Sequence, residues 1–169
     1  MTAYVALIRA VNVGGRKLLM ADLKMIAENL ELSSVRTFIA SGNLLFESRK
    51  SEPLVKAELE AALGKHMGHP IDVMVRTSAE MERVVAANPF PAAGKKAVAI
   101  FLDGKPPRDA AASAKNATDE EVALGRREIY VHYPSGQGQS KLRIPAAKDG
   151  TARNMNTVAK LAELAREMG

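Results

Sequence analysis

The first apolar run of the chain, AYVALIRA at residues 3–10, is the feature that most limits the folds open to it. The run is almost entirely apolar but too short for an independent helix, which indicates a central strand buried on both faces. Apolar residues then recur at helical spacing, which predicts an amphipathic helix over about 20–31. Strand-like runs follow at 35–40 and 44–48, and the Ser-Gly-Asn sequence at 41–43 predicts a hairpin turn between them.

A second helix is predicted from its two ends and its apolar stripe. Ser51 is a suitable N-cap, Pro53 suits a first helical turn, and Gly68 is a suitable stop. The apolar stripe between them consists of Val55, Leu59, Leu63 and Met67. An alternating run at 71–76 then predicts a strand. The element order is therefore strand, helix, strand, strand, helix, strand, which is typical of a ferredoxin-like split βαβ unit.

The middle of the chain predicts a connection between two modules. Thr77 and Glu80 have the spacing of a capping box and predict a connecting helix. The sequence NPFPAAGKK at 88–96 is rich in Pro, Gly and small residues and has the composition of a linker. We therefore expect a first α/β module over residues 1–76, a connecting helix and linker over 77–96, and a second α/β module with a C-terminal helix over 97–169.

The order of elements then restarts. A strand is predicted at 97–102, a short helix at 106–115, a strand pair within 120–133 and a helix at about 155–168, without a clear final strand. YVALI and VAIFL would be corresponding central strands. The predicted fold class is thus α+β, with two tandem ferredoxin-like (split βαβ) modules and antiparallel or mixed sheets.

Composition excludes several classes of protein. The 169-residue chain contains no cysteine, which rules out disulfides, thiolate metal sites and cysteine nucleophiles. No apolar run approaches the length of a membrane span, and no leader-like segment opens the chain, so we expect a cytoplasmic protein with no membrane contact. The net charge is +5, and residues 134–169 carry six basic groups against three acidic ones. This excess allows a polyanionic partner, although no run of Lys or Arg is present.

The three histidines give little support to a metal site. His66 and His69 lie three residues apart and Asp72 follows, but Gly68 and Pro70 interrupt the helix between and after the two histidines. His132 lies within a predicted strand. We expect no tightly bound transition metal and no cofactor.

Polar clusters beside predicted strand ends are the candidate binding residues. They could expose backbone N–H groups to an anion, or they could simply form glycine-permitted turns. The sequence lacks both the G-x-G-x-x-G dinucleotide fingerprint and the spacing of a P-loop. The candidates are Arg9, Asn12, Gly14, Gly15, Ser41, Gly42, Asn43, Lys141, Arg153 and Asn154.

Two of these residues have alternative explanations. Arg9 ends an apolar strand and needs a partner there, and a structural salt bridge would provide one. Ser41 lacks both the G-x-S-x-G context and an obvious base, so a turn explains it better than a nucleophile does.

Three hypotheses for function remain open. In the first, the protein binds an anion, namely the phosphate of a nucleotide or a nucleic acid. In the second, it is an enzyme acting on a small polar metabolite in a cleft between the modules, with Ser41, Asn43, Arg153 and Asn154 in the site. In the third, it is a partner-binding module without catalytic activity. If a pocket exists, we expect Arg9 within about 15 Å of Ser41, with Asn12 and Asn43 close by.

Five stretches together resemble one known family. They are VALIRAVNVGGRKLLMADLK, VRTFIASGNLLFES, NPFP, IYVHYPSGQGQSKL and TARNMNTVAKLAEL. In this content and order the chain resembles the bacterial domain-of-unknown-function 1697 family. The resemblance implies a cytoplasmic bacterial protein with a duplicated ferredoxin-like architecture, and it implies no reaction, cofactor or catalytic residue. Two positions depart from the family pattern, which usually has Gly at Ala10 and Trp at Met155.

Overall fold

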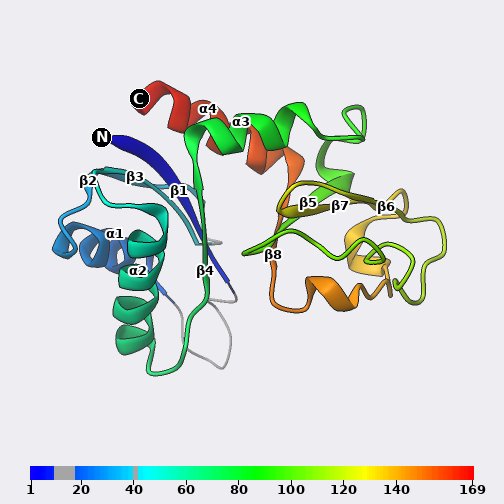
Figure 1. Ribbon diagram of the computed structural model, residues 1–169, viewed down its shortest axis with the longest axis horizontal. Coiled ribbons are helices and arrows are strands. Elements are labelled where there is room, and N and C mark those ends of the chain that lie inside the picture. The colour runs from blue at the N-terminus through cyan, green and yellow to red at the C-terminus, as the bar shows by residue number, and fades with distance from the viewer. Residues whose placement is uncertain (10–17, 40–41) are drawn as a thin grey trace. The chain divides into compact units, whose positions relative to one another are not determined.

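The computed structural model describes residues 1–9, 18–39 and 42–169 (Figure 1). Over these residues the chain forms a mixed α+β fold with two four-stranded antiparallel sheets and four α-helices. The chain divides into two units. The first unit contains residues 1–82 and 161–169, and the second contains residues 83–160.

The first unit has the element order predicted for residues 1–76. Its elements are β1 (Thr2–Ile8), α1 (Met20–Asn29), β2 (Ser33–Thr37), β3 (Asn43–Ser48), α2 (Glu52–Met67), β4 (Val73–Thr77) and the first part of α3 (Ser78–Ala86). The strands lie in the order β2-β3-β1-β4, and each neighbouring pair is antiparallel. The β2–β3 pairing confirms the predicted hairpin.

The core of the first unit lies between the sheet and the helices α1 and α2, which cover the same face of it (Figure 1). The four residues of the predicted apolar stripe of α2 are all buried there, namely Val55, Leu59, Leu63 and Met67. In α1, Leu23 and Ile26 are buried, whereas Leu19, the N-cap residue before this helix, is 57% exposed. Burial of these apolar side chains is the main force that holds the helices to the sheet.

Local hydrogen bonds fix the helix ends where the sequence predicted them. The Ser51 hydroxyl accepts a bond from the backbone N–H of Leu54 at 3.4 Å, and Gly68 ends α2 with a left-handed φ of 79°. The capping box of α3 is complete. The Glu80 N–H donates to Thr77 Oγ1, and the Thr77 N–H donates to Glu80 Oε1, both at 3.1 Å.

The second unit departs from the sequence prediction in two places. Its elements are the remainder of α3, β5 (Ala97–Phe101), β6 (Glu121–Leu124), β7 (Glu128–His132), β8 (Thr151–Asn154) and the first part of α4 (Met155–Met168), with 3₁₀ turns at Gly94–Lys96, Gln137–Gln139 and Pro145–Ala147. The predicted short helix at 106–115 is wrong, because this segment forms only single turns. The predicted lack of a final strand is also wrong, because β8 pairs with the edge of β5.

The two sheets have equivalent strand orders and registers. β6-β7-β5-β8 repeats the order of the first sheet. Val5 of β1 lies between Leu45 and Arg76, and Ala99 of β5 lies between Tyr130 and Arg153. In both sheets the last strand leads directly into a helix, α3 after β4 and α4 after β8. The strands at 4–8 and 98–101 therefore occupy the same position in their sheets.

Burial of the three tyrosines predicts a late alkaline transition. Burial raises the pKa of Tyr4 and Tyr133, and burial together with Glu128 raises the pKa of Tyr130 to about 12. The folded state thus favours the neutral phenol. The resulting contribution to the stability of the fold is complete below the unfolded pKa of about 10 and is lost as the pH rises towards 12. We expect tyrosinate absorbance to appear at higher pH in the native protein than in concentrated guanidinium chloride. Coincident native and denatured titration curves would contradict this.

Candidate functional site

Arg9 lies at the end of β1 and is held by the segment that leads into β4. Its guanidinium Nη1 lies 3.7 Å from Asp72 Oδ2, and its backbone N–H donates to the Asp72 carbonyl at 3.0 Å. Both side chains are partly exposed. The structural salt bridge proposed for Arg9 is therefore present, with Asp72 as the partner.

Gly42 directly precedes β3, and Asn43 is the first residue of that strand. Gly42 adopts a φ of 78°, and its carbonyl accepts a hydrogen bond from the Ile8 N–H at 2.9 Å. The Asn43 side chain is fully buried, and its Nδ2 donates to the Phe38 carbonyl at 2.9 Å. These contacts place Gly42 beside the end of β1 that leads to Arg9. Asn12, Gly14, Gly15 and Ser41 lie outside the described residues, so the expected convergence of Arg9 with Asn12 and Ser41 stays a prediction.

Arg153 and Asn154 belong to the second unit and have structural contacts there. Arg153 is 8% exposed, and its Nη1 donates to Thr151 Oγ1 at 2.7 Å and to the Ala152 carbonyl at 2.9 Å. Burial lowers the pKa of its guanidinium to about 10, so the group stays charged at neutral pH. Asn154 Oδ1 accepts from the Thr157 N–H at 3.0 Å and caps α4.

Lys141 lines a polar hollow in the second unit. The hollow has a volume of about 450 Å³ and is lined by Asn116, Ala117, Thr118, Gln139 and Lys141. Its walls come from two segments, 115–120 and 135–143. An antiparallel bridge joins them at one end, where Lys115 and Arg143 exchange backbone hydrogen bonds of 2.7 and 2.9 Å. At the other end, the Ser135 hydroxyl donates to Asp119 Oδ2 at 2.6 Å.

Of the residues that line this hollow, Lys141 alone was a candidate from the sequence. Gln139 lies two residues before it in the polar stretch SGQGQSK at 135–141, but Gln139, Asn116 and Thr118 were not among the candidates. Asn116 adopts a left-handed φ of 61°, a conformation that Asn tolerates better than most residues. Asn116 follows an Ala-rich segment, and in that position it is a weak signal of a turn. No pattern in the sequence indicates that it lies near Lys141.

The histidines have separate neighbours. His66 Nε2 on α2 lies 3.6 Å from Asp22 Oδ2 on α1, while Asp72 contacts Arg9. His132 Nδ1 lies 3.2 Å from Glu121 Oε1, and its ring lies against Phe90. Among the residues that the structure describes, no group of three potential ligands is placed to hold a metal ion.

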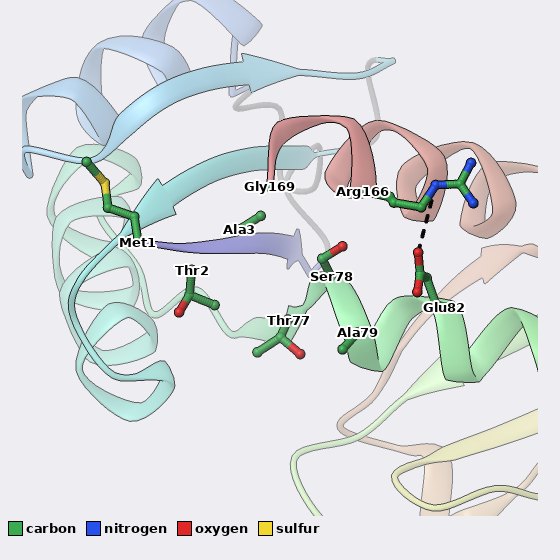
Figure 2. A pocket seen from close by; sticks show the side chains of 9 residues that line it. All are labelled: Met1, Thr2, Ala3, Thr77, Ser78, Ala79, Glu82, Arg166 and Gly169. Atoms are coloured by element: carbon green, nitrogen blue, oxygen red, sulfur yellow. Dashed lines mark ion pairs between the residues drawn. The ribbon is translucent and has the colours of Figure 1, made fainter.

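A second hollow of about 390 Å³ lies in the first unit (Figure 2). It is bordered by the start of β1, the first turn of α3 and the end of α4. Figure 2 shows the ion pair at its rim, in which Arg166 Nε lies 3.9 Å from Glu82 Oε1. Both side chains are strongly exposed, so this pair contributes little stability.

Comparison with known proteins decides the family. Residues 1–130 match the family described as "Protein of unknown function (DUF1697)". The chain belongs to the DUF1697 family. No curated protein matches it.

A solved structure extends the similarity of this DUF1697 chain over almost its full length. The structure is that of a conserved bacterial protein from Streptococcus pneumoniae, with 25% sequence identity and a TM-score of 0.82. The alignment covers 98% of this chain and 99% of that chain. Lys141 and Gln139 lie beyond the residues matched by the DUF1697 family, so the hollow is only partly within the matched region.

One departure from the DUF1697 pattern can be located. Met155, where the resemblance implies Trp, is the first residue of α4 and is 5% exposed. A buried Met at this position is consistent with packing, because its flexible thioether fills irregular space. Ala10, the other departure, lies outside the described residues. In the part of the chain that is described, none of the helices has the length and apolar character needed to cross a bilayer.

Proposed function

We propose that this DUF1697 protein binds a phosphate-bearing ligand, a nucleotide or a nucleic-acid phosphate, in the hollow around Lys141. One observation carries the proposal: the side chains that line the hollow are an ammonium, two amides, a hydroxyl and one methyl group, without a carboxylate. The ammonium and amide groups are hydrogen-bond donors, whereas the hydroxyl already donates its proton to Glu120, and phosphate oxygens are acceptors only. The lining thus has the chemistry that an anionic ligand needs.

The flanking charges support the same ligand class. Lys115 and Arg143 form the backbone bridge beside the hollow, and both side chains are exposed. Residues 134–169, which supply one wall, hold most of the excess positive charge of the chain. A volume of about 450 Å³ is within the range of small-molecule sites, roughly 300–1,000 Å³. The alternative of an enzyme acting on a small polar metabolite has weaker support, because Asn43 and Asn154 are engaged in a turn and a helix cap.

Lys141→Ala tests the proposal. We expect it to weaken binding of ATP or a short single-stranded oligonucleotide roughly tenfold, because one charge-assisted hydrogen bond is lost. Binding is measured by titration calorimetry, and by the shift in melting temperature that a ligand of the native state produces. Oligonucleotide affinity should also fall with added salt through counterion release.

Lys105→Ala is the matched control, because it removes the same charge from an exposed position in the same unit. It should leave both affinities nearly unchanged. Equal affinities of the two variants would overturn the site, and failure of the wild-type protein to bind either probe would overturn the function.

We also propose that the chain contains two tandem copies of one ferredoxin-like split βαβ module, with residues 1–76 and 97–169 as the copies and 77–96 as the connection. The equivalent strand orders and registers support this. So does the matching junction of strand and helix, where Thr77 and Asn154 accept bonds from Glu80 and Thr157 in the same position of α3 and α4.

A further inference from the structure

The Glu120 carboxylate lies where the two walls of the Lys141 hollow meet. Its Oε1 accepts hydrogen bonds from the Thr118 hydroxyl at 2.7 Å, from the Thr118 N–H at 3.2 Å and from the Asp119 N–H at 3.3 Å. Its Oε2 accepts a bond from the Ser140 hydroxyl at 3.0 Å. One side chain therefore holds both the segment that carries Thr118 and the segment that carries Lys141.

The contacts around Glu120 continue into the second wall. Ser140 lies between Gln139 and Lys141, and its hydroxyl also accepts a bond from the Leu142 N–H at 3.1 Å. The backbone bridge of Lys115 and Arg143 ties the same two segments at the opposite end of the hollow. The lining residues thus lie between the backbone bridge at one end and two side-chain contacts at the other, Glu120 with Ser140 and Asp119 with Ser135.

We infer that Glu120 is the positioning residue of this site: through Thr118 and Ser140 it fixes the two walls against each other, so that the Asn116 amide of one wall and the Lys141 ammonium of the other can donate to one phosphate group. This inference rests on the proposed function. Glu120 is not among the side chains that line the hollow, and its charge opposes an anionic ligand. Its contribution to binding is therefore geometric, through preorganisation of the donors.

The ionisation of Glu120 is consistent with this role. The hydrogen bond from the Thr118 hydroxyl, helped by bonds from Ser140 and the backbone, outweighs desolvation and lowers the pKa of this carboxyl to about 2. The carboxylate is thus fully charged at neutral pH and acts only as an acceptor. The titratable groups that interact with it are Asp119 and Tyr133, and Lys141 follows Ser140 in the sequence.

For Glu120→Gln, the loss of the charge and the loss of the positioning contact predict opposite changes in phosphate affinity. If only charge mattered, removal of a negative group near the hollow would strengthen phosphate binding. If position matters, binding weakens, because the amide nitrogen of Gln cannot accept the Ser140 hydroxyl proton. We expect roughly three- to tenfold weaker binding of ATP, which is the loss of about one neutral hydrogen bond.

Glu121→Gln is the matched control. It makes the same change of charge one residue away, and the Glu121 carboxylate contacts His132 rather than the hollow. It should leave ATP affinity unchanged or raise it slightly. Ser140→Ala should weaken binding as Glu120→Gln does, and Ser140→Thr, which keeps the hydroxyl, should restore it.

The claim that Glu120 holds the two walls together is also tested without a ligand, so that this test does not depend on the proposed function. In the ligand-free protein, Glu120→Gln should shift the backbone amide resonances of Gln139 and Lys141 as well as those of Thr118 and Asp119. Shifts confined to residues 118–121 would show that Glu120 does not tie the two walls, and the inference would be wrong. Unchanged or tighter ATP binding by Glu120→Gln, or equal weakening by Glu121→Gln, would overturn it as well. If wild-type protein binds no ATP while the amide shifts extend to both walls, the proposed function fails and the contact of Glu120 with both walls stands.

Discussion

Phe46→Ala is expected to lower the free energy of unfolding by about 3–5 kcal/mol. Phe46 lies in β3 with no exposed surface, within the core between the first sheet and the helices α1 and α2. It stands opposite Tyr4 of β1, and the two ring centroids are 5.6 Å apart. The substitution removes this aromatic contact and leaves a cavity in a tightly packed layer, and both losses add to the lost transfer energy.

The measurement is chemical denaturation followed by circular dichroism. Leu54→Ala is the control, because Leu54 lies on α2 but is 46% exposed, and its truncation should change stability by no more than about 0.5 kcal/mol. Phe46→Leu should give an intermediate loss, since it keeps most of the buried apolar volume. A loss of less than about 1 kcal/mol for Phe46→Ala would mean that the sheet and helices are not packed as described.

Elements with a complete local signal were predictable from the sequence. The helix α2 has a capping residue, a proline in its first turn, an apolar stripe and a terminal glycine, and each of these favours the same structure. The Ala-rich segment at 106–115 has prolines at its start, but it lacks a stripe of large apolar residues and a terminal glycine. It forms separate turns, such as those closed by the Ala110 N–H to the Pro107 carbonyl and by the Ser113 N–H to the Asp109 carbonyl. The helix α1 is equally short, but Leu23, Ile26 and Ala27 are buried on one face of it, whereas Ala110 is the one buried residue of 107–115, so little packing offsets the cost of nucleation there.

The strand β8 could not be predicted, because its sequence has little strand character. Thr151, Ala152, Arg153 and Asn154 show neither an apolar run nor a clear alternation. The strand forms because the edge of β5 offers unpaired backbone groups, and pairing with Phe101, Ile100, Ala99 and Val98 satisfies them. Tertiary context, rather than propensity, decides the conformation of this segment.

Only one wall of the candidate site could be predicted from the sequence, because the two walls come from separate segments of the chain. The stretch at 135–141 contains two glycines, two glutamines and a lysine, and this composition indicates a candidate anion site at Lys141. Asn116 and Thr118 lie more than twenty positions earlier. They reach the hollow through the Lys115–Arg143 bridge and the contacts of Glu120 with Ser140. Contacts between such separated segments leave no periodicity in the sequence.

Gly150→Ala is expected to destabilise the second unit by about 3 kcal/mol, the upper end of the usual cost of overpacking. A Cβ at Gly150 would lie 2.8 Å from Ile100 Cγ2, 2.9 Å from Leu102 Cδ2 and 2.9 Å from the Phe101 carbonyl oxygen. The side chains of Ile100 and Leu102 could rotate, but the carbonyl belongs to the β5–β8 ladder and cannot move without breaking the pairing with Thr151.

Gly104→Ala provides the control for this substitution, since a Cβ there meets no atom within 4 Å. It should be neutral or slightly stabilising, because alanine restricts the unfolded chain. The melting temperatures of the two variants separate the steric effect at Gly150 from the effect that any Gly→Ala change has on the unfolded chain. Because Gly150 directly precedes β8, the destabilised variant should also lose protection from hydrogen exchange first in residues 151–154. If the two variants melt at the same temperature, then the close approach of Gly150 to β5, and with it the register that places Arg153 opposite Ala99, is wrong.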